Sequence, residues 1–244
     1  MSRFDARKDN HPDGYIHDGD PGIWCPHLWS WVVDKFEVKS VLEIGCGEGH
    51  VTRFFQGLGC RVDGVIPDRS ARKNDPAIES LHPHDFSHGP YKAEEAVDMV
   101  WSCAFLDRIA QEHVPNVLAT CAAAGKVILI AHATPGEEDD QHVNCQPSSY
   151  WIRQIEPLGF RCDVDLSREG RKITLRDYPG VNRFARSGLV FVRTNSSASP
   201  EKATSVFSGM RIGFDARYRA FRINQGFRWS IEFQEHMRKC KSQL

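Results

Sequence analysis

Three glycines at alternate positions separate a short apolar run from an amphipathic stretch. Gly45, Gly47 and Gly49 follow residues 41–44 and precede His50. Glycine tolerates positive φ and lets a ligand approach the backbone, and a helix N-terminus offers free N–H groups. The spacing differs from the G-x-G-x-x-G of dinucleotide dehydrogenases, and no G-K-[ST] of a phosphate-binding loop follows. The pattern predicts a ligand-binding turn between a strand and a helix, with an ordinary tight turn as the alternative.

Two histidines stand where an α/β enzyme holds its substrate. His132 follows the strand-like run 126–131, and His142 lies in the next loop. Substrates bind beyond the carboxyl ends of parallel strands, and histidine exchanges protons near neutral pH. Either residue could take the proton of an acceptor hydroxyl, while a structural hydrogen bond is the alternative for each. Asn144 and Gln146 could orient substrate hydroxyls or only hold the loop. Alignment of the reactants without any base is a further possibility.

A third group of histidines has the spacing H-x-H-x-x-x-H. Residues two apart on a strand face the same side, so His82 and His84 could both bind a metal, with His88 nearby. Pro83 stands between the first two. We favour exposed or hydrogen-bonding histidines over a metal site, and we expect no bound metal.

Helices and strands alternate along the chain. Periodicity predicts helices over 24–37, 50–58, 112–123 and 148–158, and strands over 41–44, 61–66, 97–101, 126–131, 160–164 and 189–193. Such alternation implies right-handed crossovers. The predicted fold class is therefore α/β, with a doubly wound and mainly parallel sheet.

The glycine-rich segment resembles motif I of the class I S-adenosylmethionine-dependent methyltransferases. Three other segments support a resemblance that covers roughly residues 24–195: His84-Asp85-Phe86, Asp98-Met99-Val100-Trp101-Ser102 and the run from Lys126 to His132. The resemblance implies a Rossmann-like sheet of seven strands and S-adenosyl-L-methionine as the cofactor. It also implies a set of cofactor-binding residues, namely Glu43, Gly45, Cys46, Gly47, Gly49, Asp68, Asp85, Phe86 and Ser102.

The family also implies a role for most of these residues. The backbone from Gly45 to Gly49 would follow the methionine and ribose parts of the cofactor, and Glu43 would orient an amide, a water or the cofactor ammonium. Asp85 and Phe86 would lie beside the adenine.

The sequence departs from the family pattern in two places. The acidic residue that accepts from the ribose hydroxyls is replaced by Ile66. Asp68 either takes its place or only caps a turn. Where related chains often have Glu-His, this chain has Asp107-Arg108, so a general base from that dipeptide is missing. If a base exists, His142 and His132 are the catalytic candidates.

Composition excludes a disordered or membrane-embedded chain. The 244 residues are 41% hydrophobic and 26% charged, and the mean hydropathy is -0.45. No apolar run is long enough for a membrane helix, and the N-terminus lacks an export signal. We expect a cytoplasmic protein whose eight scattered cysteines are reduced.

Charge divides the chain. Residues 201–244 carry a net charge of +5, whereas residues 1–200 carry -6. We expect a tail or lid (1–20), a methyltransferase domain (21–195), a linker (196–205) and a basic, aromatic C-terminal extension (206–244). The extension either packs on the domain or on a second subunit, giving a homo-oligomer, or it binds RNA.

The function predicted from the sequence is methyl transfer to an oxygen of a small hydroxylated molecule or a sugar. Two alternatives stay open. One is an RNA methyltransferase that binds its RNA through the basic extension, although the first 200 residues are net acidic. The other is a non-catalytic scaffold that keeps the fold, which Ile66 supports.

Overall fold

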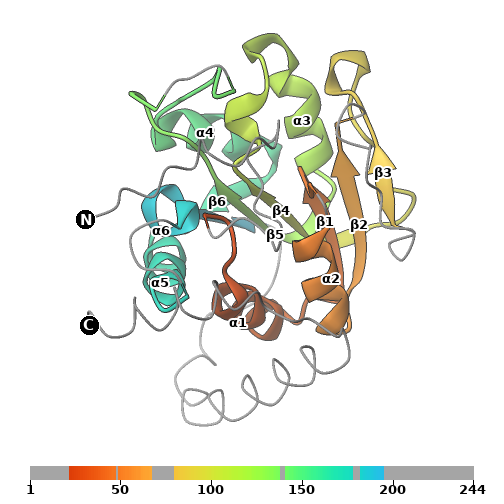
Figure 1. The fold of residues 1–244 in the computed structure, drawn as a ribbon, viewed down its shortest axis with the longest axis vertical. Helices are drawn as coiled ribbons and strands as arrows, with labels where there is room; N and C mark the ends of the chain where they lie inside the picture. The colour runs from red at the N-terminus through yellow and green to blue at the C-terminus, as the bar shows by residue number, and fades with distance from the viewer. Residues whose placement is uncertain (1–21, 48, 68–79, 138–140, 178–181, 195–244) are drawn as a thin grey trace, which may run out of the picture.

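One seven-stranded sheet organises the molecule. The computed structural model describes residues 22–47, 49–67, 80–137, 141–177 and 182–194. Within these residues the strand order is β3-β2-β1-β4-β5-β7-β6 (Figure 1). The strands are β1 (Ser40–Ile44), β2 (Arg61–Ile66), β3 (Leu81–Pro83), β4 (Val97–Cys103), β5 (Ala124–Ala131), β6 (Phe160–Cys162) and β7 (Leu189–Arg193).

The sheet is parallel except at one strand. β1 pairs in parallel with both β2 and β4, and the parallel pairing continues to β3 on one side and β5 on the other. β7 runs antiparallel between β5 and β6. The predicted fold class, a mainly parallel doubly wound sheet of seven strands, is therefore confirmed.

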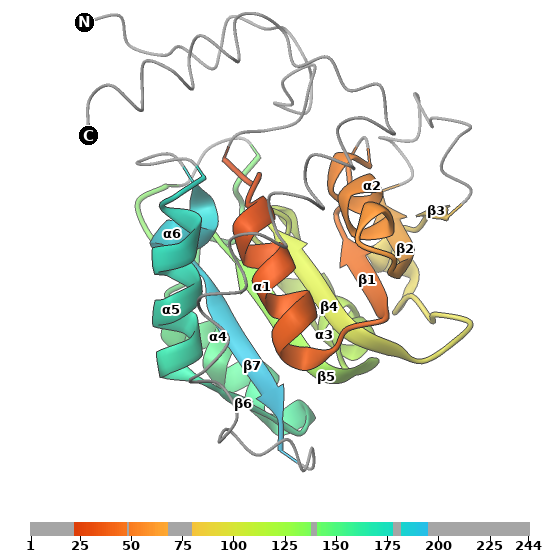
Figure 2. The same cartoon turned by 90° about the horizontal axis from the view of Figure 1, so that it is seen from below.

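Helices cover both faces of this sheet. They are α1 (Pro26–Phe36), α2 (His50–Gly57), α3 (Val114–Cys121), α4 (Ser148–Ile155), α5 (Val164–Thr174) and α6 (Arg183–Ser187), with 3₁₀ turns at Phe86–His88, Leu106–Arg108, Gln111–His113 and Glu156–Leu158. Figure 2 shows α1, α5 and α6 on one side of the sheet, and α3 and α4 on the other.

Side chains at alternate strand positions pack into two separate hydrophobic cores, one on each face of the sheet. Val41, Met99 and Leu129 point to the face where Trp29 of α1 and Phe54 of α2 are packed. The intervening strand positions point to the opposite face, where α3 and α4 supply most of the helical apolar side chains. Because strand side chains alternate, the apolar runs of the sequence fill both cores at once, as expected for parallel strands buried on both faces.

The predicted strand over 160–164 is wrong at its end. β6 stops at Cys162, and Asp163 caps a helix that the sequence analysis missed, because its Oδ1 accepts from the Leu166 N–H at 3.0 Å. The very short strand β3 and the helix α6 were also missed. Three residues and five residues are too few to produce a periodic signal.

Several expectations fall outside the described residues. These are the tail 1–20, the linker 196–205, the extension 206–244 and Asp68. Among the helices that the structure does describe, none combines the length and apolar character needed to cross a membrane.

A tight contact at the end of α6 provides a stability test. A Cβ on Gly188 would overlap both the ring and the carbonyl oxygen of Phe184. We expect Gly188→Ala to lower the free energy of unfolding by about 1–3 kcal/mol, since a well-packed site must distort to admit the methyl group. Urea unfolding measures this.

Gly125→Ala is the matched control for that test. The nearest atom to its Cβ is the Val97 carbonyl oxygen at 3.2 Å, a much milder contact. A loss for Gly188→Ala no larger than that of the control would contradict the packing argument.

Candidate functional site

The glycine-rich turn lies directly after β1. Gly45, Gly47 and Gly49 all have positive φ, at 85°, 53° and 79°. The N–H of Gly45 donates to the Val65 carbonyl at 2.8 Å, and Gly49 is the N-cap of α2. A Cβ on Gly45 would lie 2.6 Å from the side chain of Phe105, so the turn is pressed against the segment that follows β4. This geometry requires glycine and leaves the start of α2 available to a ligand.

Glu43 is a buried acid on β1, two residues before the first of these glycines. Only 2% of the Glu43 residue is exposed to solvent. The Thr52 hydroxyl donates to Oε2 at 2.5 Å, and no cation among the described residues pairs with it. Burial raises the pKa of Glu43 to about 7, although the hydrogen bond from Thr52 opposes the shift. A positively charged group placed nearby would therefore be favoured.

Cys46 and Ser102 are also buried at this edge. The Ser102 hydroxyl donates to the Ile44 carbonyl at 3.1 Å and so joins the ends of β1 and β4. Burial raises the pKa of the Cys46 thiol well above its usual range. Cys46 is therefore a small neutral side chain here rather than a nucleophile.

The predicted adenine residues differ in exposure. Phe86 is buried and meets Phe105 edge-on, with ring centroids 5.9 Å apart. Asp85 caps the short turn after β3, and the Ser87 N–H, which donates at 2.8 Å, lowers the pKa of its carboxyl. Phe86 thus offers an apolar surface next to Phe105, and Asp85 offers an ionised carboxylate.

The three clustered histidines each have a separate partner. His82 faces Asp63 at 3.5 Å, His84 contacts the Gly89 carbonyl at 2.9 Å, and His88 faces Asp85 at 3.6 Å. Within the described residues, no three potential metal ligands converge. These contacts are those of hydrogen-bonding histidines.

Ile66 ends β2 and is 1% exposed. It belongs to the buried part of the strand and offers no hydrogen-bond acceptor. Asp63, farther back on β2, is engaged by Arg61 at 2.7 Å and by His82. Asp68, which the sequence analysis gives either as the replacement acid or as a turn cap, lies outside the described residues.

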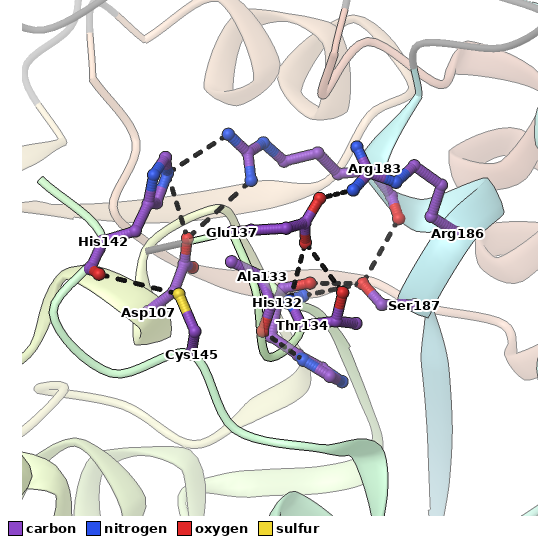
Figure 3. Close-up of polar contacts among 10 residues, drawn as sticks. All are labelled: Asp107, His132, Ala133, Thr134, Glu137, His142, Cys145, Arg183, Arg186 and Ser187. Atoms are coloured by element: carbon purple, nitrogen blue, oxygen red, sulfur yellow. Dashed lines mark hydrogen bonds and ion pairs between the residues drawn. The ribbon is translucent and has the colours of Figure 1, made fainter. Parts of the chain in front are cut away.

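His132 lies just beyond β5 and both of its ring nitrogens are occupied. Nδ1 contacts the Ala133 carbonyl at 3.0 Å and Nε2 contacts the Ser148 hydroxyl at 3.2 Å. The residue is 2% exposed, and burial lowers its pKa. In Figure 3 its ring points away from His142. These contacts join the end of β5 to the start of α4.

His142 belongs to a buried charged group that the sequence analysis did not predict. Its Nε2 lies 3.3 Å from Oδ2 of Asp107 and 3.2 Å from Nη2 of Arg183, and Nη1 of Arg183 lies 3.8 Å from the same carboxylate oxygen (Figure 3). Asp107 follows β4, His142 follows β5 and Arg183 begins α6. Such a group can orient an imidazole and stabilise its charge.

The sequence contained part of the signal for this group. Asp107-Arg108 stood out only as a departure from the family pattern. The structure brings Asp107 to a histidine from a different loop, so an acidic residue and a histidine do meet here, although not from one dipeptide. Arg183 had no signal, because α6 itself was missed.

The raised pKa of Glu43 predicts a pH-dependent stability. An unfolded Glu43, with a pKa near 4.5, releases its proton before the folded one, with a pKa of about 7. The folded protein therefore loses stability as pH rises from about 4.5 to about 7, by about 3 kcal/mol if the whole shift is expressed. We expect Glu43→Gln, which keeps an oxygen for Thr52, to abolish this loss in urea unfolding between pH 5 and pH 8.

Glu95→Gln controls for general charge removal, because that side chain is 72% exposed. The pH dependence of its stability should match that of the wild type. An unchanged pH dependence in Glu43→Gln would show that this carboxyl ionises normally in the folded protein.

Known proteins that are similar to this chain include methyltransferases. The sequence matches no model of a protein family. It is 26% identical over 182 residues to a malonyl-[acyl-carrier protein] O-methyltransferase of Brevibacillus brevis (strain 47 / JCM 6285 / NBRC 100599). The match covers 63% of this chain and 64% of the relative, slightly less than two thirds of the relative's length.

Crystal structures of several methyltransferases are similar to the chain in fold. Human N-acetylserotonin methyltransferase in complex with SAM has a TM-score of 0.47 at 12% identity, over 70% of this chain and 51% of that one. A SAM-dependent methyltransferase from Archaeoglobus fulgidus has a TM-score of 0.45 at 17% identity, over 68% and 90% of the two chains. The observed strand order, the glycine-rich turn and the sequence match to the Brevibacillus protein agree with the resemblance to the class I S-adenosylmethionine-dependent methyltransferases.

Proposed function

We propose that the protein transfers a methyl group from S-adenosylmethionine to an oxygen atom of a small hydroxylated molecule or a sugar. One observation carries the proposal. The glycine-rich turn after β1 and Asp107 after β4 lie at the carboxyl ends of adjacent strands, and Phe105 connects them by packing against Gly45. Asp107 in turn lies 3.3 Å from Nε2 of His142. A cofactor on the turn and an acceptor beside His142 would then be neighbours.

The residues around the turn fit the cofactor. Three positive-φ glycines let a ligand approach the backbone of the turn without meeting their side chains, and the buried acid Glu43 suits the cofactor's ammonium. Asp85 and Phe86 would face the adenine, and Asp68 would serve the ribose in place of Ile66. Cys46 and Ser102 would line the site as small neutral groups. When bound, S-adenosylmethionine supplies an electrophilic methyl group on a positively charged sulfur.

His142 would act as the general base. The imidazole would accept the proton that the acceptor hydroxyl loses, and S-adenosylmethionine held by the glycine-rich turn would supply the methyl group that this oxygen gains. Removing this proton makes the oxygen a better nucleophile, which is the usual contribution of a positioned histidine. His132, with both ring nitrogens occupied, would hold the loop instead.

A carboxyl oxygen is the second candidate acceptor. The relative from Brevibacillus is named as an O-methyltransferase of a malonyl group on an acyl carrier protein. An ionised carboxylate is already a nucleophile and needs no base. The two acceptor classes can therefore be separated by their dependence on His142.

Cofactor binding tests the glycine-rich turn. We expect Gly47→Ala to weaken S-adenosylmethionine binding at least tenfold in calorimetry, because a methyl group would occupy the space that the backbone contact needs. Gly59→Ala is matched for strain, since Gly59 has φ +84° and nothing within 4 Å of its Cβ, at the other end of α2. It should bind normally. Equal affinities for the two variants would place the cofactor elsewhere, and no binding by the wild type would support a non-catalytic scaffold.

The turnover number kcat tests whether His142 is the general base. With a hydroxyl acceptor identified by a screen with labelled methyl groups, His142→Ala should lower kcat by about 10²–10⁴-fold and leave cofactor affinity unchanged. With a carboxylate acceptor the same variant should keep most of its activity. His132→Ala should lower stability through its lost contacts with Ala133 and Ser148 rather than kcat. If both variants kept full activity on the hydroxyl acceptor, methyl transfer would need only the alignment of the reactants and no histidine base.

A further inference from the structure

Three polar side chains of α6 face the loop between β5 and α4. This β5–α4 loop spans residues 132–147 and carries both candidate histidines. Arg183, Arg186 and Ser187 are spaced i, i+3 and i+4, so they share one side of the helix. Figure 3 shows all three reaching from α6 toward residues of the loop. The spacing within α6 thus places a polar face against this loop.

Another side of α6 is anchored in the core. Phe184 is fully buried and stacks on Trp101 of β4, with ring centroids 5.7 Å apart. Asn182 caps the helix and donates from Nδ2 to the Trp24 carbonyl at 3.1 Å. α6 is therefore fixed to the sheet and to the segment before α1, and its polar face has a defined position.

The first contact of that face holds the start of the loop. The Ser187 hydroxyl donates to the His132 carbonyl at 2.5 Å and accepts from the His132 N–H at 3.1 Å. One hydroxyl thus satisfies both backbone groups of the residue directly after β5. A buried backbone group without a partner is costly, so this contact fixes where the loop leaves the sheet.

The second contact holds a turn within the loop. Arg186 forms an ion pair with Oε1 of Glu137. Oε2 of Glu137 accepts from both the N–H and the hydroxyl of Thr134, at 2.7 and 3.0 Å. The Glu137 N–H also donates to the Thr134 carbonyl at 3.1 Å. Glu137 therefore closes the turn 134–137 and attaches it to α6.

The third contact holds His142. Nη2 of Arg183 donates to Nε2 of the imidazole at 3.2 Å. The backbone nearby is also held, since the Asn144 N–H donates to the Asp107 carbonyl at 2.9 Å. The loop is thus attached to α6 at its start, at its turn and at His142. Ordering a loop costs conformational entropy, and these contacts offset that cost.

Exposure distinguishes the three contacts. Ser187 is buried and Arg183 is partly buried, whereas the Arg186 side chain is 52% exposed. An ion pair in contact with water contributes little to stability. Removing the Arg186 guanidinium should therefore release the turn at Glu137 and leave the folded core unchanged.

We propose that α6 positions the β5–α4 loop for the acceptor, and that Arg186 is a positioning residue that acts through Glu137. The inference rests on the proposed function, because it takes the loop with His142 as the place where the acceptor binds. Arg186 takes no part in the transfer of the methyl group or the proton. It keeps the turn between His132 and His142 in the shape that the acceptor requires.

An NMR measurement tests the positioning without any acceptor. The full chain is labelled with ¹³C,¹⁵N-histidine, and the ring signal of His142 is identified by its absence from the His142→Ala spectrum. Arg186→Met and Glu137→Gln should each shift this signal, because the loop relaxes when the ion pair is lost. Glu137→Gln keeps an oxygen for Thr134 and so removes only the charge. Arg186→Lys, which keeps the pair, should keep the wild-type signal.

A second exposed pair of arginine and carboxylate provides the matched control. The Arg168 side chain, 60% exposed, contacts Asp165 at 2.9 Å within α5. Arg168→Met removes the same charge outside the loop, so the His142 signal should stay at its wild-type position. Equal shifts in Arg168→Met and Arg186→Met would show a general effect of charge and overturn the proposal. A wild-type signal in both Arg186→Met and Glu137→Gln would overturn it as well.

Kinetics then connect the loop to turnover. With the acceptor from the screen, Arg186→Met should lower kcat/KM about 5- to 50-fold with cofactor affinity unchanged, since a small displacement of a positioned group reduces the rate strongly. Arg186→Lys should recover most of this loss. Adding Glu137→Gln to Arg186→Met should cause no further loss, because the two residues act as one unit.

Two kinetic results would overturn the positioning role. One is a wild-type kcat/KM in Arg186→Met, and the other is a double variant in which the two effects multiply. Failure of the wild type to bind S-adenosylmethionine would refute the proposed function, while the NMR result would still decide whether α6 positions the loop.

Discussion

The parallel pairing of β1 with β4 is the constraint on which the site depends. The chain order of the strands reverses here, since β1 leads outward to β2 and β3 while β4 leads to β5 in the other direction. The connections leave the two strand ends in opposite directions, and ligands of open α/β sheets bind at such a reversal. Ser102 fixes the ends together through its hydrogen bond to the Ile44 carbonyl. The glycine-rich turn and the segment carrying Asp107 are neighbours for this reason.

Two buried acids at this edge have contrasting environments. Glu43 has one hydroxyl partner, and burial raises its pKa to about 7. Asp107 is at least as deeply buried, yet it has a histidine and an arginine beside it. The first arrangement favours the arrival of a positive charge, as a cofactor ammonium would supply. The second already contains its countercharge, and so it suits a group that must orient a side chain.

Some elements were predictable because their signal is local. The apolar runs of β1, β2, β5 and β7 are short and bounded by turn residues, and each was predicted nearly at its observed ends. α5 was missed because its sequence, VDLSREGRKIT, is largely polar and buries only a narrow stripe that includes Gly170 and Ile173. The helix is stable because that stripe packs against α6 and against α1, and α1 is distant in the chain.

The sequence by itself determined the fold class, the position of the glycine-rich turn and the two histidines worth testing, because strand periodicity and glycine spacing depend on neighbouring residues. Only the tertiary structure decided that the two histidines differ. It placed Ala133 and Ser148 against the ring of His132, and Asp107 and Arg183 against that of His142. Three separate segments meet at His142 because the ends of β4 and β5 and the start of α6 converge above one edge of the sheet, and no local pattern encodes that convergence.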